Sequence, residues 1–367
     1  MIAERLAARH DVTILTTCAK DHITWHNEYP AGLSEAGPLH IRRFSVARPR
    51  SLHRFHEKSE VVFSGGAPAA EQEQWFRENG PEAPGLLDYL KTHGSAFDRI
   101  LFWSFRYYQT FFGLPLVADR AVLVPTAEED PVIRLGILDA FFSKPAGYLF
   151  LTPEEQTLVQ LHTSRPLPPS AVIGVGLDPA TAAPGAALGP LGVDSPYLLY
   201  LGRIDPNKGC GTLLRFFSKR RRELASALDV PLVMAGPANM PIPDDPAIRR
   251  LGFVTPAARE TLLANAAALI VPSPYESLSM VLLEAWNHGV PALVNARCAV
   301  LKGQALRSNG ALYYHNYDEF ARGLDFLLGR PDAARELGRQ GLAYVEREYR
   351  WPAVIGKIEA LLANLRI

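Results

Sequence analysis

The chain has 367 residues, more than the roughly 100–200 of a usual single domain, so we expect two domains. Lys plus Arg and Asp plus Glu are equal at 38 each, which excludes an overall electrostatic field that draws the protein to nucleic acid or an anionic membrane. No stretch approaches the roughly 18 consecutive apolar residues of a membrane span, and the three widely spaced cysteines favour a reducing compartment over a disulfide framework or a zinc site.

The first half of the sequence alternates short apolar runs with stretches of helical period. The chain opens inside an amphipathic helix, because Ile2 and Leu6 lie on one face and the charged residues among them exclude a signal peptide. Apolar runs rich in β-branched residues predict five strands, at 12–15, 99–103, 121–124, 148–151 and 171–175. Helical patterns between them, such as 132–142 and 153–161, predict a parallel sheet covered on both faces. Residues 20–38 indicate a long loop and residues 64–85 a mobile excursion.

The same alternation restarts after residues 179–196, which are rich in Ala, Gly and Pro and are typical of a linker. Strands are predicted at 197–201, 231–234, 268–271, 291–294 and 311–314, and the pattern is almost wholly helical from about residue 317. We therefore predict an N-terminal domain over 1–178, a C-terminal domain over 197–350, and a last helix over 351–367 that packs back on the N-terminal domain.

A dense basic run follows the first strand of the second domain. It comprises Lys219, Arg220, Arg221 and Arg222 and is followed at once by Glu223. A run of this kind is most often a solvated helix face, and an acidic partner or a membrane surface is the alternative. We expect a cytoplasmic protein, with at most peripheral association at the inner face of the membrane.

The first candidate site is the loop after the strand at 197–201. Gly202 and Arg203 end the strand, Lys208 and Gly209 follow, and a helix begins near Cys210. Ligands of open α/β sheets bind beyond the carboxyl ends of the strands, and a helix N-terminus there offers N–H groups to an anion. Two cations in the same loop suit a diphosphate, and an ordinary turn with solvated cations is the alternative.

The second candidate site follows the strand at 268–271. A helix is expected from about Ser277, with serine as its cap, to Gly289. Glu276 then lies at the start of this helix and Glu284 about two turns into it, roughly 10–12 Å along the axis. Two carboxylates at that separation cannot share one proton, but they can bind two parts of one elongated ligand.

The combination resembles a known family. Gly202-Arg203 with Lys208-Gly209, followed by Glu276 and Glu284 as Glu-x7-Glu, is similar to the retaining glycosyltransferases of family 4. The resemblance is close over about 197–315 and looser before it. It implies the α/β fold called GT-B, in which two Rossmann-like domains with parallel sheets face each other across a cleft.

The resemblance also implies roles for particular residues. Arg203 and Lys208 would bind the donor diphosphate and, with Glu276, act in catalysis; Gly202 would line the same loop. Glu276 would contact the hydroxyls of the donor sugar and Glu284 those of the ribose. Backbone at Phe253 and Val254 would lie against the base, and Leu278, Ser279 and Met280 would present amides to the phosphates. No cofactor or metal is expected; the donor substrate is a nucleotide sugar, most simply a UDP- or GDP-sugar.

Two features depart from the family pattern. The family's first strand and Gly-rich loop do not precede Met1, so we expect a start that lies upstream, a fragment, or a degenerate homologue. Relatives often carry a histidine near Glu128, where this chain has Glu128, Glu129 and Asp130, which cap a helix from Pro131 or recognise a different sugar. An active enzyme of polysaccharide or glycoconjugate biosynthesis, with a glycan, lipid or other acceptor, is the first hypothesis. A non-catalytic nucleotide-sugar-binding partner is the alternative, and a nucleotide-sugar epimerase is disfavoured.

Overall fold

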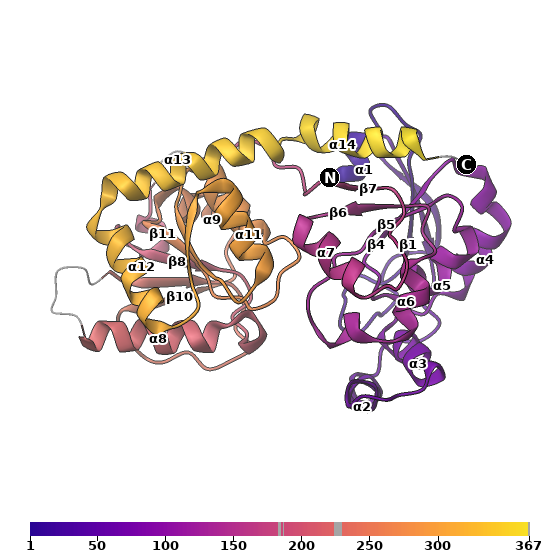
Figure 1. Cartoon of the computed structure of the whole chain (residues 1–367), viewed down its shortest axis with the longest axis horizontal. Helices are drawn as coiled ribbons and strands as arrows, with labels where there is room; N and C mark the ends of the chain where they lie inside the picture. The colour runs from indigo at the N-terminus through magenta and orange to yellow at the C-terminus, as the bar shows by residue number, and fades with distance from the viewer. Residues whose placement is uncertain (183–184, 186, 224–229, 366–367) are drawn as a thin grey trace. The chain divides into compact units, whose positions relative to one another are not determined.

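The computed structural model describes residues 1–182, 185, 187–223 and 230–365. The chain divides into two compact units, which we call the N-terminal unit (Met1–Val175 with Val354–Ile367) and the C-terminal unit (Gly176–Ala353). Residues 183, 184 and 186 of the predicted linker and residues 366 and 367 of the predicted last helix lie outside the described residues. Figure 1 colours the chain by residue number, so that both units can be followed from strand to strand.

The C-terminal unit is built on one sheet of six strands, all parallel to their neighbours. The order across the sheet is β10-β9-β8-β11-β12-β13, so the chain runs outward from β8 in one direction and then from β11 in the other. This is the strand order of a doubly wound Rossmann sheet, whose switch point lies between its first and fourth strands. The strands are β8 (Leu198–Leu201), β9 (Leu232–Ala235), β10 (Ile248–Gly252), β11 (Ala268–Val271), β12 (Ala292–Asn295) and β13 (Ala311–Tyr314).

Helices connect these strands and cover both faces of the sheet. They are α8 (Cys210–Glu223), α9 (Pro256–Asn265), α10 (Met280–Asn287), α11 (Ala299–Ser308), α12 (Tyr317–Gly329) and α13 (Pro331–Glu348); α14 (Trp351–Asn364) ends the described chain. Phe217 of α8 and Phe320 of α12 are fully buried and share one hydrophobic cluster with Leu198 and Met234 of the sheet. In Figure 1, α8 runs below the sheet and α13 above it. Apolar stripes of several helices thus bury the near-continuously apolar strands.

The basic run of α8 is divided among different environments. Arg220 is 2% exposed and pairs with Asp325 of α12 at 2.7 Å, and Arg221 pairs with Asp245 at 2.8 Å. Lys219 lies 3.7 Å from Glu223, and Arg222 is exposed. The run is therefore neither a uniformly solvated face nor a continuous basic patch, because two of its four cations hold α8 to its neighbours.

The N-terminal unit holds two sheets where the sequence predicted one. The sheet β4-β5-β6-β7 is parallel, as expected from its apolar runs. A separate sheet, β1-β3-β2, pairs β1 with β3 in parallel and β2 with β3 in antiparallel. The strands are β1 (Thr13–Thr17), β2 (Gly32–Ala36), β3 (Leu39–Phe44), β4 (Ile100–Trp103), β5 (Ala121–Val124), β6 (Gly147–Phe150) and β7 (Ser170–Val172).

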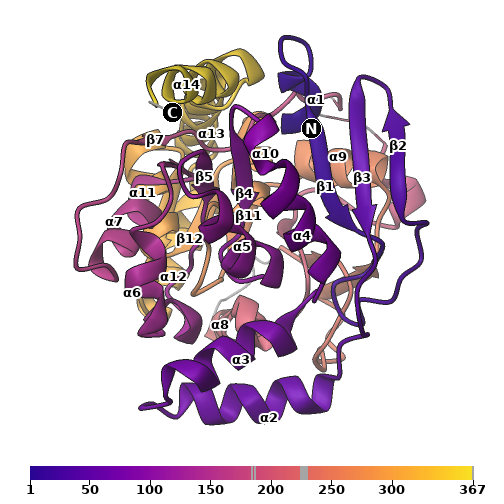
Figure 2. The same ribbon diagram turned by 90° about the vertical axis from the view of Figure 1, so that its right-hand side faces the viewer.

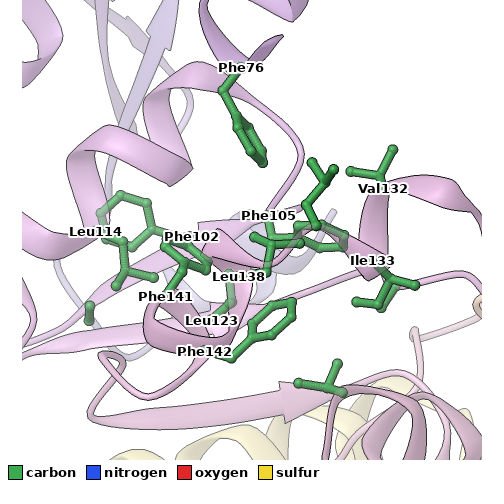
Figure 3. Packing of buried hydrophobic residues seen from close by; sticks show 14 of the residues in the cluster. Phe76, Phe102, Phe105, Leu114, Leu123, Val132, Ile133, Leu138, Phe141 and Phe142 are labelled. Atoms are coloured by element: carbon green, nitrogen blue, oxygen red, sulfur yellow. The ribbon is translucent and has the colours of Figure 1, made fainter. Parts of the chain in front are cut away.

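The helices of this unit pack largely on one another, and α7 packs on β6. They are α1 (Ile2–Leu6), α2 (Leu52–Phe63), α3 (Ala69–Asn79), α4 (Pro84–His93), α5 (Tyr108–Gly113), α6 (Ile137–Phe142) and α7 (Pro153–Leu161). Figure 2 shows α2 and α3 lying side by side, and Trp75 of α3 donates to Ser59 of α2 at 2.9 Å. Figure 3 shows the core beneath them, in which Phe105, Phe142 and Leu138 point toward one another.

Several predictions about local structure were wrong. The predicted loop over 20–38 contains β2, and the predicted mobile excursion over 64–85 contains α3, whose Phe76 is fully buried and stacks on Phe111 with ring centroids 3.9 Å apart. The predicted helix at 132–142 is a short 3-10 turn over Pro131–Arg134 followed by α6. Two strands, β3 and β10, were missed because arginines interrupt their apolar runs, as is usual for edge or half-buried strands.

The C-terminal residues belong to the N-terminal unit. Arg9 pairs with Glu359 of α14 at 2.8 Å, and the Arg99 side chain donates to the carbonyl oxygen of Leu365. A side chain at Gly147, at the start of β6, would approach Leu365 to 3.0 Å. Among the described residues, no helix is long and apolar enough to span a bilayer.

Candidate functional site

Two neighbouring loops carry the predicted site residues, and the topology places them together. One loop follows β8 and the other follows β11, and these strands pair directly, with Leu198 opposite Ala268 and Leu199 opposite Leu269. Both loops therefore leave the carboxyl edge of the sheet at its switch point, where the helices of an open sheet diverge and leave room for a ligand. The predicted loops lie where a Rossmann-type ligand site is expected.

The β8 loop is held in a compact form by its own hydrogen bonds. Asp205 caps the short 3-10 turn Pro206–Lys208 by accepting from Asn207 N at 2.9 Å. Burial raises the pKa of Asp205, but this bond and one from Asn239 outweigh it and leave that pKa lowered. The Tyr200 hydroxyl donates to the Arg203 carbonyl oxygen, 2.5 Å away. These contacts leave the Arg203 side chain exposed at the edge of the sheet.

Gly209 brings the β8 loop against the β11 loop. Its φ is +74°, and an added Cβ would lie 2.2 Å from the carbonyl oxygen of Pro272. Only glycine permits both this left-handed backbone and this approach. Asn295, at the end of β12, donates from Nδ2 to the same Pro272 oxygen at 3.0 Å. The Pro272 carbonyl group is thus held by Asn295 at the end of β12 and packed against by Gly209 of the β8 loop.

The two predicted loops meet through an ion pair. Lys208 Nζ lies 2.9 Å from Glu276 Oε1, and the two side chains are 29% and 16% exposed. Partly desolvated charges at this distance interact more strongly than a surface pair, because less water screens them. The structure therefore brings together Lys208 and Glu276, 68 residues apart in the chain.

Helix α10 starts later than predicted. Its first residue is Met280, and Ser279 precedes it with a left-handed φ of +66° and no side-chain capping bond. The expected start near Ser277, with serine as a side-chain cap, is wrong, because the turn after Pro274 does not enter the helix until residue 280. The separation of Glu276 and Glu284 estimated from helical rise does not hold, since Glu276 lies in a loop.

The start of α10 still presents backbone donors at the sheet edge. N–H groups of the first helical turn have no acceptor four residues earlier within the helix. A left-handed residue followed by right-handed ones also turns successive N–H groups toward one side, which favours an anion. Leu278 and Ser279 are only 3% and 5% exposed, and Met280 after them is partly buried, so this turn is packed into the unit.

Glu284 is deeply placed and has a partner that the sequence did not indicate. Its side chain is 14% exposed, and Arg259 of α9 binds both of its carboxylate oxygens. Burial raises the pKa of Glu284, and the Arg259 guanidinium opposes this rise. Arg259 belongs to no motif. The sequence shows only a charged residue near the start of a helix, and it does not show which way its side chain points or which residue it meets.

The loop after β10 exposes an aromatic side chain. Phe253 is 85% exposed, the largest exposure among the large hydrophobic residues described, while Val254 beside it is partly buried. Gly252 accepts from Gly236 N at 2.7 Å, which ties the end of β10 to the end of β9. An added Cβ at Gly236 would in turn lie 2.0 Å from the Gly202 carbonyl oxygen, so Gly202, Gly236 and Gly252 pack the strand ends closely.

The acidic segment after β5 in the N-terminal unit has its own cation. Asp130 caps the turn from Pro131 by accepting from Val132 N at 3.0 Å, as the sequence indicated. Arg106, in the loop after β4, hydrogen-bonds Asp130 and lies 3.8 Å from Glu128. Two of the three consecutive acids therefore face Arg106, which lies 22 residues earlier than Glu128 in the chain, and Glu129 lies 3.5 Å from Arg134.

A buried carboxylate supports the same segment from beneath. Glu155 of α7 is fully buried, and its two oxygens accept from Ala127 N at 2.7 Å and Leu151 N at 2.6 Å. Burial raises the pKa of Glu155 to about 8 against the opposing effect of these N–H donors. Thr126, which adjoins this anchor, has a left-handed φ of +50°. Glu155 fixes the loops after β5 and β6, and its role was not visible in the sequence.

Thiols and clusters of metal ligands are the other side-chain groups that could carry chemistry. Cys18, Cys210 and Cys298 are buried free thiols, and burial raises the pKa of Cys298 to about 11. Within the described parts of the chain, no three His, Cys, Asp or Glu side chains cluster as metal ligands would. The groups available for chemistry at the β8–β11 edge are Arg203, Lys208, Glu276, the backbone N–H groups of α10, and Glu284.

Comparison with known proteins finds a matching family model and sequence relatives. Residues 195–330 match the family model described as glycosyl transferases group 1. A D-inositol 3-phosphate glycosyltransferase of Kribbella flavida is 28% identical over 303 residues, which cover 74% of this chain and 70% of the relative. These similarities support a glycosyltransferase.

Solved structures share the fold over nearly the whole chain. Sucrose-phosphate synthase from Thermosynechococcus elongatus superposes with a TM-score of 0.72 at 16% identity, covering 99% of this chain and 91% of that one. HepE of Anabaena, solved in complex with UDP and glucose, gives 0.63 at 14% identity over 89% and 86% of the two chains. The fold is thus GT-B, with two α/β units built on parallel strands.

Proposed function

We propose that this chain is a retaining glycosyltransferase that transfers a sugar from a nucleotide-sugar donor, most simply UDP- or GDP-linked, to a glycan, lipid or other acceptor. The observation that carries the proposal is the meeting of Lys208 and Glu276 at the switch point of the C-terminal sheet. A cation for a diphosphate and a carboxylate for sugar hydroxyls are held within 2.9 Å of each other there. The glycosyltransferase relatives and the UDP complex of HepE support this direction.

The C-terminal unit supplies a group for each part of such a donor. The exposed Phe253 and the backbone after it lie where a base would be bound, beyond the carboxyl end of β10. Glu284 would accept from the ribose hydroxyls. Arg203, Lys208 and the first N–H groups of α10 would surround the diphosphate, and Glu276 would accept from hydroxyls of the sugar.

Catalysis would consist mainly of stabilising the leaving diphosphate. Breaking the sugar–phosphate bond places negative charge on the bridging oxygen, and positive groups already fixed near that atom lower the barrier. Lys208 is suited to this role because Glu276 orients its ammonium group before the donor binds. With Arg203 it would provide two positive charges, so we infer a metal-independent reaction. Retention of the anomeric configuration is proposed from the resemblance to family 4.

The test is to incubate the protein with radiolabelled UDP-, GDP- and ADP-sugars and to measure both binding and release of sugar. Hydrolysis or transfer that is lost in Glu276→Ala supports the enzyme. Nucleotide affinity should fall by about 10-fold or more in Arg203→Ala and in Lys208→Ala, since each removes a charge-assisted contact. Lys91→Ala, which removes a cation of the N-terminal unit that is 57% exposed, is the matched control.

The outcomes separate the hypotheses. Tight binding without turnover of any donor would favour a non-catalytic nucleotide-sugar-binding protein. Unchanged nucleotide affinity in both Arg203→Ala and Lys208→Ala would refute the donor site itself. Conversion of a free nucleotide sugar into its epimer, without an acceptor, would indicate an epimerase.

A further inference from the structure

The side chain of Asn295, the last residue of β12, joins two loops at the carboxyl edge of the C-terminal sheet. Its Oδ1 accepts from Arg297 N at 3.0 Å, and its Nδ2 donates to the carbonyl oxygen of Pro272 at 3.0 Å. An N–H faces one end of the amide and a carbonyl oxygen faces the other, so only one orientation of the amide satisfies both partners. The amide of Asn295 is therefore fixed across the ends of β11 and β12.

The register of the sheet explains why a side chain makes this contact. β11 pairs with β12 up to Val271 opposite Val294, so Pro272 and Asn295 are the next pair along the two chains. Proline has no N–H with which to continue a ladder of hydrogen bonds. The Asn295 side chain supplies a donor to Pro272 at this point. The loop after β11 is thus held to β12 directly beyond the last paired residues.

The turn from Pro272 to Glu276 is stiff enough to transmit this hold to the carboxylate. Pro272 and Pro274 each fix one backbone dihedral angle of the turn. Ser273 between them is 2% exposed, and its Oγ donates to the carbonyl oxygen of Tyr275 at 2.8 Å. A turn with two fixed dihedral angles and an internal hydrogen bond moves largely as one piece, so the place of its first carbonyl group affects the place of Glu276.

The loop after β12 also contacts the far end of this turn. Cys298 is 4% exposed, and its N–H donates to the carbonyl oxygen of Asn295 at 3.2 Å. Burial raises the pKa of Cys298, and the backbone N–H groups of Leu301 and Glu276 oppose this rise. The thiol therefore lies beside the backbone of Glu276. One loop, which begins at Asn295, thus meets both ends of the turn.

The Pro272 carbonyl group lies between the two members of the Lys208–Glu276 ion pair. Gly209, which follows Lys208, packs against this carbonyl group, and Glu276 comes four residues after it. Asn295 is the side chain that donates to it. A partly buried carbonyl oxygen that loses its donor is unfavourable until it reaches water. Without the Asn295 amide, the turn is expected to move outward and to carry Glu276 with it.

We propose that Asn295 is a positioning residue for Glu276, whose amide holds the turn over 272–276 so that the carboxylate meets the sugar part of the donor. This inference rests on the proposed function, in which Glu276 accepts from sugar hydroxyls, and adds the group that fixes this carboxylate. Asn295 acts through Glu276 and need not touch the donor. Its loss should weaken recognition of the sugar more than that of the nucleotide, because Phe253 and Glu284, the proposed contacts of base and ribose, lie on other elements.

The experiment compares UDP-glucose with UDP by titration calorimetry on the full chain, and GDP-mannose with GDP if the wild type binds that pair more tightly. The measured quantity is the ratio of the affinity for the nucleotide sugar to that for the free nucleotide. Asn295→Asp keeps the acceptor for Arg297 N and places an oxygen against the Pro272 carbonyl oxygen. It should lower the ratio by about 3- to 10-fold, as expected for one lost hydrogen bond. Asn295→Ala should lower the ratio in the same direction.

Asn265 supplies the matched control. Its Nδ2 donates to the carbonyl oxygen of Thr261 at 2.9 Å and its Oδ1 accepts from Gly185 N at 2.8 Å, the same two kinds of bond that Asn295 makes. Asn265 precedes β11, whereas Asn295 ends β12, so the two lie at opposite edges of the parallel sheet. Asn265→Asp should lower the thermal midpoint about as much as Asn295→Asp and leave the ratio unchanged.

A double-mutant cycle shows whether Asn295 acts through Glu276. Glu276→Ala alone should lower the ratio more than Asn295→Asp does. Asn295→Asp added to Glu276→Ala should lower the ratio no further, because the group that it positions is gone. The rate of sugar release should follow the same pattern, with kcat about 10-fold lower in Asn295→Asp, since a small displacement of a reacting group is costly.

Four results would overturn the inference. A wild-type ratio in both Asn295 variants would show that Glu276 is held without the amide. Equal weakening of UDP and UDP-glucose, with the lowered thermal midpoint of Asn265→Asp, would show a structural role only. Additive losses in the Glu276→Ala background would show that Asn295 acts on another group. If the wild type binds no nucleotide sugar, the proposed function fails and the inference with it, whereas binding with an unresponsive ratio refutes only the role of Asn295.

Discussion

Replacing Gly209 tests whether contact between the two loops creates the donor site. An alanine Cβ at this position would lie 2.2 Å from the Pro272 carbonyl oxygen, while real Cβ contacts essentially never fall below 3.0 Å. The loops must therefore separate by about 0.8 Å, since close-packed backbone cannot absorb the overlap in place. Lys208 precedes Gly209 directly, and its contact with Glu276 across the two loops is 2.9 Å long. A shift of about 0.8 Å is large enough to break a hydrogen-bonded ion pair whose atoms lie 2.9 Å apart.

Two separate losses follow from this displacement. A left-handed backbone with a side chain costs roughly 1–2 kcal/mol of folding free energy. Misplacement of catalytic groups by about 1 Å lowers the rate by about 100-fold. Gly209→Ala should therefore reduce kcat/KM by about 100-fold, whereas the free energy of unfolding should fall by only a few kcal/mol, since the clash adds to the backbone cost.

Gly289 supplies the matched control. Its φ is +69°, similar to that of Gly209, but an added Cβ would meet nothing within 4 Å. Gly289→Ala should therefore lose about 1–2 kcal/mol of stability and keep nearly normal activity. Chemical denaturation measures the stabilities, and sugar release from the best donor measures kcat/KM. If Gly209→Ala is as active as Gly289→Ala, the loops do not depend on this contact and the reasoning is refuted.

Three further predictions concern other parts of the structure. Burial raises the pKa of Glu155 from 4.5 to about 8, so stability should fall as pH rises from about 4.5 to about 8 and level off above it, and Glu155→Gln should remove this slope in denaturation titrations. Arg220→Met should destabilise the fold by about 1.5–3 kcal/mol, because it removes the charge-assisted hydrogen bonds to Asp325, which is itself 44% exposed; an unchanged unfolding curve would contradict this. Phe253→Ala should weaken nucleotide binding by about 3- to 10-fold without changing the thermal midpoint, since this ring is 85% exposed.

The architecture of the C-terminal unit could be predicted from sequence because its strands are buried on both faces. Each of β8, β9 and β11 is a continuous apolar run, and such runs are recognisable without tertiary information. β10 escaped because Arg249 and Arg250 are exposed at the edge of the sheet, where no apolar pattern is required. Prediction was therefore most accurate where burial constrains every residue and least accurate at the edges.

The meeting of the two predicted loops could be inferred from strand order, whereas the partners of charged residues on helices could not. Lys208 and Glu276 stand in loops at the carboxyl ends of neighbouring strands, a position that sequence order reveals once the strands are known. Arg259 and Glu155 lie within helices, and their directions depend on how those helices pack. A single charged residue in a helix has many possible partners, so its sequence position alone does not identify the one it meets.

The acidic segment after β5 shows how a tertiary partner changes the meaning of a sequence feature. From sequence, Glu128 is expected to weaken binding of a diphosphate donor, because it places a carboxylate where relatives often carry a neutral or cationic histidine ring. In the structure, Arg106 hydrogen-bonds Asp130 and lies 3.8 Å from Glu128, and both acids are less than one-third exposed. An ion pair presents a much weaker field to an approaching anion than a lone carboxylate does. The segment therefore presents less unpaired negative charge than the sequence indicates, and Glu155 anchors it from within the N-terminal unit.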